Sequence, residues 1–103
     1  MVSKELKTKI LKSLAAVDYD KVILFGSRAR GDQTRYSDFD LLLILSGHIS
    51  ITEKIRLATL LRKKFAGDLI DADVVVKDKD DIEYLKDKPG SIVRNALGEG
   101  VVL

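Results

Sequence analysis

The feature that most constrains the fold is LLLIL, five consecutive aliphatic residues at positions 41–45. Successive side chains of a strand point to opposite faces, so this run predicts a strand that is buried on both faces. Two further strands are predicted at KVILF (21–25) and at LIDADVVV (69–76), which are rich in β-branched residues. A sheet with such strands must be covered by helices on both sides.

Helical spacing of apolar residues predicts these covering helices. One is expected over residues 3–17, and a second over residues 51–66, where Ser50 and Glu53 form a capping box. The apolar stripe of the second helix is predicted to comprise Ile51, Ile55, Ala58, Leu61 and Phe65. Shorter helical segments are expected at 78–87 and 91–97, with a small edge strand at the end of the chain. The order predicts an α/β (α+β) fold, a small mixed sheet of three or four strands flanked by helices, in a single domain over residues 1–103.

Composition excludes several classes of site. The chain has 103 residues, a net charge of +2 and no cysteine, so disulfides and thiolate metal sites are excluded. The weak net charge does not indicate a nucleic-acid or membrane surface, and no apolar run approaches the roughly 20 residues of a membrane span. A cytoplasmic protein with no membrane or nucleic-acid partner is therefore expected.

Pairs of aspartates stand at the beginning of two predicted strands. Asp38 and Asp40 are two residues apart, so both side chains project from the same face of their strand. Two such carboxylates repel each other, and a divalent cation such as Mg²⁺ removes that penalty. A third carboxylate, Asp71 or Asp73, can join them if the strands are neighbours, and Asp73 is favoured because it directly precedes VVV. Three such acids could hold two metal ions.

A glycine-serine turn precedes these acids. Gly26 and Ser27 follow a strand and open a short helical segment, where exposed backbone N–H groups attract phosphate. Arg28 and Arg30 add positive charge, and Arg30 can bind phosphate through its guanidinium fork. The turn is not a Walker A loop, because Asp32 stands where that motif requires lysine. Helix capping by Ser27 is the alternative interpretation of this turn.

The stretch GSRARGDQTRYSDFDLLLIL, residues 26–45, resembles the G-S-x-A-R-G-(x)5-S-D-x-D-L signature of the minimal nucleotidyltransferases. These enzymes belong to the superfamily with the DNA polymerase β-like nucleotidyltransferase fold. The resemblance implies that the nucleotide-binding residues are Gly26, Ser27, Arg30, Gly31 and Ser37. It also implies that Asp38 and Asp40 bind Mg²⁺ and that Asp73 serves as a further metal ligand or as a base.

The resemblance further implies the reaction and the partner. The implied reaction transfers AMP from ATP to an acceptor hydroxyl with loss of pyrophosphate, and it uses Mg²⁺, with two ions expected. Chains this short resemble the antitoxins of two-gene modules, whose other product is an all-helical HEPN protein. The expected acceptor is a tyrosine of that partner, in a hetero-oligomer.

Two alternatives are kept open. The protein could neutralise its partner by binding alone, with the acids as a relic. It could instead adenylylate a small molecule such as an aminoglycoside, although the chain offers little surface for such an acceptor.

Overall fold

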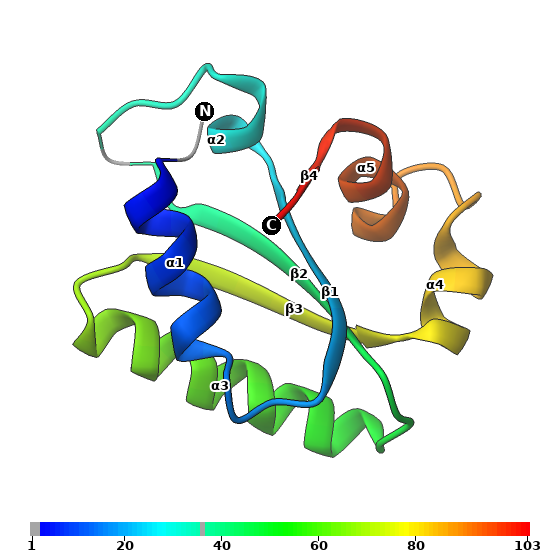
Figure 1. The fold of residues 1–103 in the computed structure, drawn as a ribbon. Coiled ribbons are helices and arrows are strands. Elements are labelled where there is room, and N and C mark those ends of the chain that lie inside the picture. The colour runs from blue at the N-terminus through cyan, green and yellow to red at the C-terminus, as the bar shows by residue number, and fades with distance from the viewer. Residues whose placement is uncertain (1–2, 36) are drawn as a thin grey trace.

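The computed structural model describes residues 3–35 and 37–103. Four strands form one mixed sheet in the order β3-β2-β1-β4. Their bounds are β1 Tyr19–Phe25, β2 Phe39–Leu45, β3 Ala72–Asp78 and β4 Val101–Val102. β1 runs antiparallel to β2 and to β4, whereas β2 and β3 run parallel. The predicted small mixed sheet flanked by helices is therefore confirmed (Figure 1).

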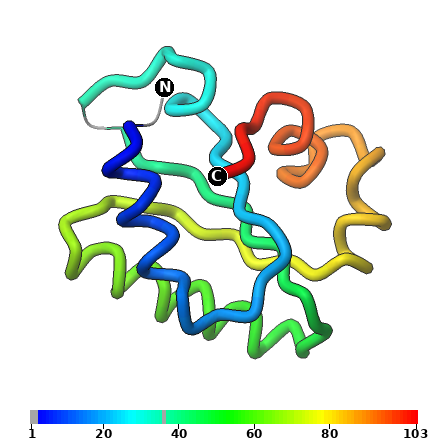
Figure 2. Tube along the Cα trace, viewed as in Figure 1, coloured from blue at the N-terminus to red at the C-terminus, as the bar shows by residue number. Residues whose placement is uncertain are grey.

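Five helices cover the sheet in the described part of the chain. Their bounds are α1 Lys4–Ser13, α2 Ser27–Arg30, α3 Ile51–Gly67, α4 Lys79–Leu85 and α5 Ile92–Glu99. Figures 1 and 2 show α1 and α3 on one side of the sheet and α4 and α5 on the other. None of the helices in residues 3–35 and 37–103 has the length and apolar character that crossing a membrane requires.

Alternation along β2 divides its side chains between two cores. Leu41, Leu43 and Leu45 pack in the larger core with residues of α1 and α3. Leu42 and Ile44 pack in the smaller core, beneath α5 and α4. All five are at most 5% exposed, so the central strand is buried on both faces, as its sequence predicts.

The predicted apolar stripe of α3 is confirmed toward the end of the helix but is wrong near its beginning. Ile51 and Ile55 of α3 are 75% and 62% exposed, whereas Lys54 is only 7% exposed. The residues of α3 that reach the core interior are Ala58, Leu61 and Phe65. The first turn of α3 instead turns Lys54 inward, because buried Asp78 at the end of β3 supplies an opposite charge. An electrostatic pair thus overrides the apolar stripe at this end of the helix.

Several element boundaries differ from the predictions. α1 ends at Ser13, four residues earlier than predicted, and Leu14 caps it. The third strand begins at Ala72 rather than at residue 69, because Leu69 has a positive φ of 61° and reverses the chain after α3. β3 ends at Asp78. The side chain of Asp78 caps α4 by accepting a hydrogen bond from the N–H of Asp81.

Candidate active site

The acids at the beginning of β2 and β3 lie on one face of the sheet. Parallel pairing places Asp40 directly opposite Asp73, and Phe39 opposite Ala72. Asp40 shares its face with Leu42 and Ile44, which is the face covered by α4 and α5. Asp38, two residues before Asp40 in the chain, is exposed just ahead of the strand. Carboxylates from two neighbouring strands therefore lie at the same end of the two strands.

The charge of these acids is poorly compensated. The pKa of Asp40 is raised, first by burial and then by the neighbouring carboxylates of Asp73 and Asp38. Arg30 opposes this shift and Glu99 adds to it. Asp73 forms an ion pair with Arg62 of α3, at 3.4 Å between Nη1 and Oδ1, and both side chains are about half exposed. This region therefore favours an added cation.

The three acids are open rather than gathered around a point. Within residues 3–35 and 37–103, the acidic or histidine ligand atoms that all lie within 4.8 Å of one another belong to a different group, His48, Asp78 and Asp80. That group lies at the far end of β3. Its Asp78 Oδ2 is already 2.7 Å from the Lys54 ammonium, which would compete with a metal ion for that oxygen.

Asp73, rather than Asp71, is the acid opposite Asp40. Asp71 precedes β3, and its carbonyl accepts a hydrogen bond of 2.8 Å from the N–H of Phe39. This bond locks the start of β3 against β2 and so fixes the register that brings Asp73 beside Asp40.

The glycine-serine turn lies against the same acids. Gly26 caps α2 with a φ of 74°, a conformation that favours glycine. A Cβ on Gly26 would overlap the Asp40 carboxylate, so only glycine allows this close approach. Ser27 is the first helical residue and does not cap the helix. Among the described residues, its hydroxyl has no hydrogen-bond partner and is available to a ligand.

We define the phosphate-binding turn as Gly26–Gly31. Arg30 belongs to this turn, and Glu99 of α5 contacts it from outside. The guanidinium of Arg30 donates from Nη1 to both carboxylate oxygens of Glu99, each at 3.2 Å, and from Nε to Asp32 at 3.2 Å. These acids raise the pKa of Arg30, Asp32 foremost. The backbone N–H of Gly26 also donates to Glu99, at 3.2 Å. Gly31 ends α2 in the left-handed conformation.

Arg28 has a different role from the one expected. Its Nε and Nη2 donate to the carbonyl of Ser37 at 3.2 and 2.9 Å, and its guanidinium stacks 4.5 Å from the centre of the Phe39 ring. Arg28 therefore braces the loop that leads to the acids. The Ser37 hydroxyl accepts a hydrogen bond of 3.0 Å from the N–H of Thr34, inside that loop.

Sequence reasoning missed Glu99 and Arg62, and only Glu99 carried a signal. Glu99 is an acid in the last turn of a helix, where the helix dipole disfavours negative charge, so a specific partner was to be expected. Arg62 is exposed on α3, and only the tertiary structure brings it to Asp73.

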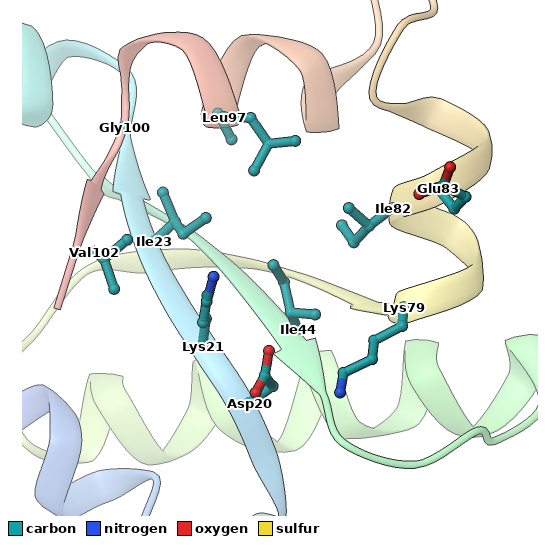
Figure 3. Close-up of a pocket in the computed structure, with 11 residues that line it drawn as sticks. Asp20, Lys21, Ile23, Ile44, Lys79, Ile82, Glu83, Leu97, Gly100 and Val102 are labelled. Atoms are coloured by element: carbon teal, nitrogen blue, oxygen red, sulfur yellow. The ribbon is translucent and has the colours of Figure 1, made fainter.

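A cleft of about 380 Å³ lies on the same sheet face, farther from the acids. Figure 3 shows Ile23, Ile44, Ile82 and Leu97 projecting into it, with Lys21 and Lys79 at its rim. Ile44 pairs with Lys21 at the opposite end of β2 from Asp40, so this cleft is separate from the acids and the glycine-serine turn.

Comparison with known families agrees with this geometry. The pattern of the family described as "Polymerase beta, Nucleotidyltransferase" matches residues 7–103, which is nearly the whole chain. The chain belongs to this nucleotidyltransferase family. The resemblance in the signature of residues 26–45 is thereby confirmed, and the protein is classed as an enzyme that transfers nucleotides.

Individual relatives of this nucleotidyltransferase extend the comparison. It is 40% identical over 93 residues to "Putative protein adenylyltransferase MJ0604" of Methanocaldococcus jannaschii, covering 90% of this chain and 86% of the relative. Its fold matches a toxin–antitoxin structure with AMP-PNP, with a TM-score of 0.61, 23% identity, and 93% and 70% of the two chains covered.

A further match is the structure of a tri-AMPylated Shewanella oneidensis HEPN toxin in complex with its MNT antitoxin. The TM-score is 0.51 at 22% identity, with 93% of this chain and 66% of the other covered. At these identities the two structural matches establish the shared fold.

Proposed function

We propose that this nucleotidyltransferase transfers AMP from ATP to the hydroxyl of a tyrosine on a partner HEPN-domain toxin and thereby acts as an antitoxin. The observation that carries the proposal is the register that sets Asp40 opposite Asp73, with the Asp40 carboxylate against Gly26. This arrangement puts excess negative charge beside a turn that presents an N–H, a hydroxyl and a guanidinium. Such a pair of features suits a polyphosphate with its divalent cations.

The residues present fit Mg²⁺. Asp38, Asp40 and Asp73 offer hard carboxylate oxygens, and the raised pKa of Asp40 reflects burial and charge crowding that a cation would relieve. These three residues would hold the metal. When bound, Mg²⁺ would neutralise phosphate charge and polarise the reacting phosphoryl group.

The chain's own residues have distinct roles in the proposed reaction. The Gly26 N–H, the Ser27 hydroxyl and Arg30 bind the phosphates of ATP and align them, while Gly31 and Ser37 shape the two ends of the intervening loop. The acceptor oxygen forms a bond to the α-phosphorus as the bond to pyrophosphate breaks. Asp73 accepts the proton of the acceptor hydroxyl. Positioning and charge stabilisation are the main requirements of such a reaction.

The partner is proposed from the relatives. A relative named as a protein adenylyltransferase and a fold match whose toxin is AMPylated both favour a protein acceptor over an aminoglycoside. Asp38 and Asp73 are also exposed at the beginning of their strands, where a second polypeptide can approach them.

The test uses the purified chain with ATP, Mg²⁺ and the HEPN protein encoded by the adjacent gene. Intact-mass spectrometry of both proteins is expected to show the mass of AMP added to the partner, and peptide mapping is expected to place it on tyrosine. The same mixture without Mg²⁺, and with the Asp38→Asn/Asp40→Asn variant, serves as control.

Two results would overturn the proposal. In the first, the partner stays unmodified, but mixing it with either the native chain or the double variant abolishes its toxin activity. This result would mean that the partner is neutralised by contact. An unmodified partner, together with AMP transfer to a small hydroxyl compound, would mean that the acceptor is not a protein.

A further inference from the structure

Glu99 accepts hydrogen bonds from both a backbone N–H and a charged side chain of the phosphate-binding turn. Its Oε1 accepts from the Gly26 N–H at 3.2 Å, and both of its oxygens accept from Arg30 Nη1 at 3.2 Å. These are two of the three groups assigned above to the phosphates of ATP. A carboxylate therefore occupies the position in which those groups would meet an anionic ligand.

The backbone holds Glu99 at this place. The next residue, Gly100, donates its N–H to the Ala96 carbonyl at 2.8 Å, and a Cβ there would overlap that carbonyl and the Ile23 side chain. Val101 then pairs with Leu24 of β1. Because α5 and β4 fix the chain on both sides of Glu99, its carboxylate can leave the turn only by side-chain rotation. The side chain is 31% exposed, so it has solvent into which to rotate.

The electrostatic environment of Glu99 disfavours a negative charge at this position. It stands at the C-terminal end of α5, where the helix dipole disfavours an anion. Its charge also adds to that of Asp73 and Asp38 in raising the pKa of Asp40. Arg30 keeps a second partner in Asp32, so it remains oriented when Glu99 withdraws.

We propose that Glu99 competes with the phosphates of the nucleotide for the Gly26 N–H and the Arg30 guanidinium, and so sets the affinity for ATP. This inference rests on the proposed nucleotidyl transfer and assigns Glu99 as a residue that determines nucleotide binding. ATP enters when the Glu99 side chain rotates outward, and the carboxylate returns when pyrophosphate leaves.

The test measures binding as well as turnover. Isothermal titration with Mg²⁺ and the non-hydrolysable analogue AMP-CPP is compared between the native chain, Glu99→Gln and Glu99→Asp. Glu99→Gln keeps the shape but removes the charge, and it is expected to lower the Kd for AMP-CPP roughly tenfold. Glu99→Asp keeps the charge but shortens its reach, so a smaller decrease is expected.

Further readouts separate competition from a structural effect. The Ki of inorganic pyrophosphate is expected to fall with the Kd for AMP-CPP, whereas the Kd for adenosine, which lacks phosphate, is expected to stay the same. The KM for ATP is expected to fall with kcat changed little. Glu53→Gln, an exposed acid in the first turn of α3, is the charge-matched control and is expected to leave every value unchanged.

The contrary outcomes are also distinct. Weaker AMP-CPP binding in Glu99→Gln would mean that Glu99 supports the turn, and an unchanged Kd would mean that phosphate binds elsewhere; both overturn the inference. If the native chain and both variants fail to bind AMP-CPP, the proposed function and the inference fail together. Tighter binding of AMP-CPP without any AMP transfer would uphold the inference and reject the proposed acceptor.

Discussion

The two ends of β3 each carry a cluster of carboxylates, but they treat charge in opposite ways. At its beginning, Asp73 faces Asp40, and burial with neighbouring acids raises the pKa of Asp40. At its end, Asp78 lies 2.7 Å from the Lys54 ammonium, which holds the pKa of Asp78 far below its usual range. The first cluster is only partly compensated, by the half-exposed Arg62 and by Arg30, whereas the second holds a buried lysine between its carboxylates. An uncompensated cluster indicates a binding site, whereas a compensated one stabilises the fold.

The largest expected effect comes from removing one charge from the uncompensated end. Asp40→Asn keeps the size of the side chain but removes a proposed metal ligand, so AMP transfer is expected to fall by roughly a thousandfold, about 4 kcal/mol in the activation free energy. Single-turnover transfer of radiolabelled AMP to the proposed HEPN-domain partner measures this. Transfer within tenfold of the native rate would remove Asp40 from the catalytic machinery.

The corresponding change at the compensated end should affect stability. Lys54→Met leaves Asp78, which is only 3% exposed, without its main opposite charge, and is expected to cost about 3–5 kcal/mol of unfolding free energy. Urea denaturation monitored by circular dichroism gives the value. Lys63→Met, at an exposed position of the same helix, is the matched control and should change stability by less than about 0.5 kcal/mol. A small loss in Lys54→Met would mean that Asp78 is not effectively buried.

The pair also has a defined dependence on pH. Because the folded pKa of Asp78 lies below its unfolded value, its stabilising effect is present above about pH 4 and is lost as the pH falls through the folded pKa. The stability difference between native and Lys54→Met chains should therefore shrink on acidification.

The contrast also explains which parts of the molecule the sequence could predict. Local patterns predicted the strands and the capping of α3 by Ser50, because each depends on nearby residues. The burial of Ile51 and Ile55 was wrongly predicted, because Lys54 takes the inward position on α3. Lys54 does so only because Asp78, 24 positions later in the chain, lies beside it. The contact of Glu99 with Gly26 was missed for the same reason, because the two residues lie far apart in the sequence. Periodic sequence patterns cannot predict which side chains of distant elements form pairs.

A smaller effect is expected when the missing cation is supplied. If Asp38, Asp40 and Asp73 hold Mg²⁺, the ion should stabilise the fold by about 1–3 kcal/mol at tenfold to hundredfold excess over its Kd. Differential scanning fluorimetry across a Mg²⁺ series measures the rise in Tm. The Asp40→Asn chain should lose most of this response, and a full response in that variant would locate the ion elsewhere.

The same variant should be slightly more stable than the native chain when Mg²⁺ is absent, by up to about 0.5 kcal/mol near pH 7, because it removes one repelling charge. The folded pKa of Asp40 is raised, so the native carboxyl favours folding only while it is protonated, and this advantage is lost as the pH rises through that pKa. The gain from Asp40→Asn should therefore appear at neutral pH and vanish below about pH 4. A gain that is independent of pH would indicate a packing effect.

The last prediction concerns His48, which lies at the Asp78 end of β3 and tests whether that end binds the metal ion. His48 Nδ1 lies 2.6 Å from Asp78 Oδ2 and close to Asp80, so these residues have metal-ligand spacing. The imidazole is 71% exposed, however, and Lys54 already neutralises Asp78. His48→Ala is therefore expected to cost less than about 1 kcal/mol and to leave both AMP transfer and the Mg²⁺ response unchanged. Unfolding in urea and the fluorimetric Mg²⁺ series measure both. If His48→Ala abolished the Mg²⁺ response, the ion would bind at the Asp78 end of β3. The roles of the two clusters would then be reversed, with the binding cluster at Asp78.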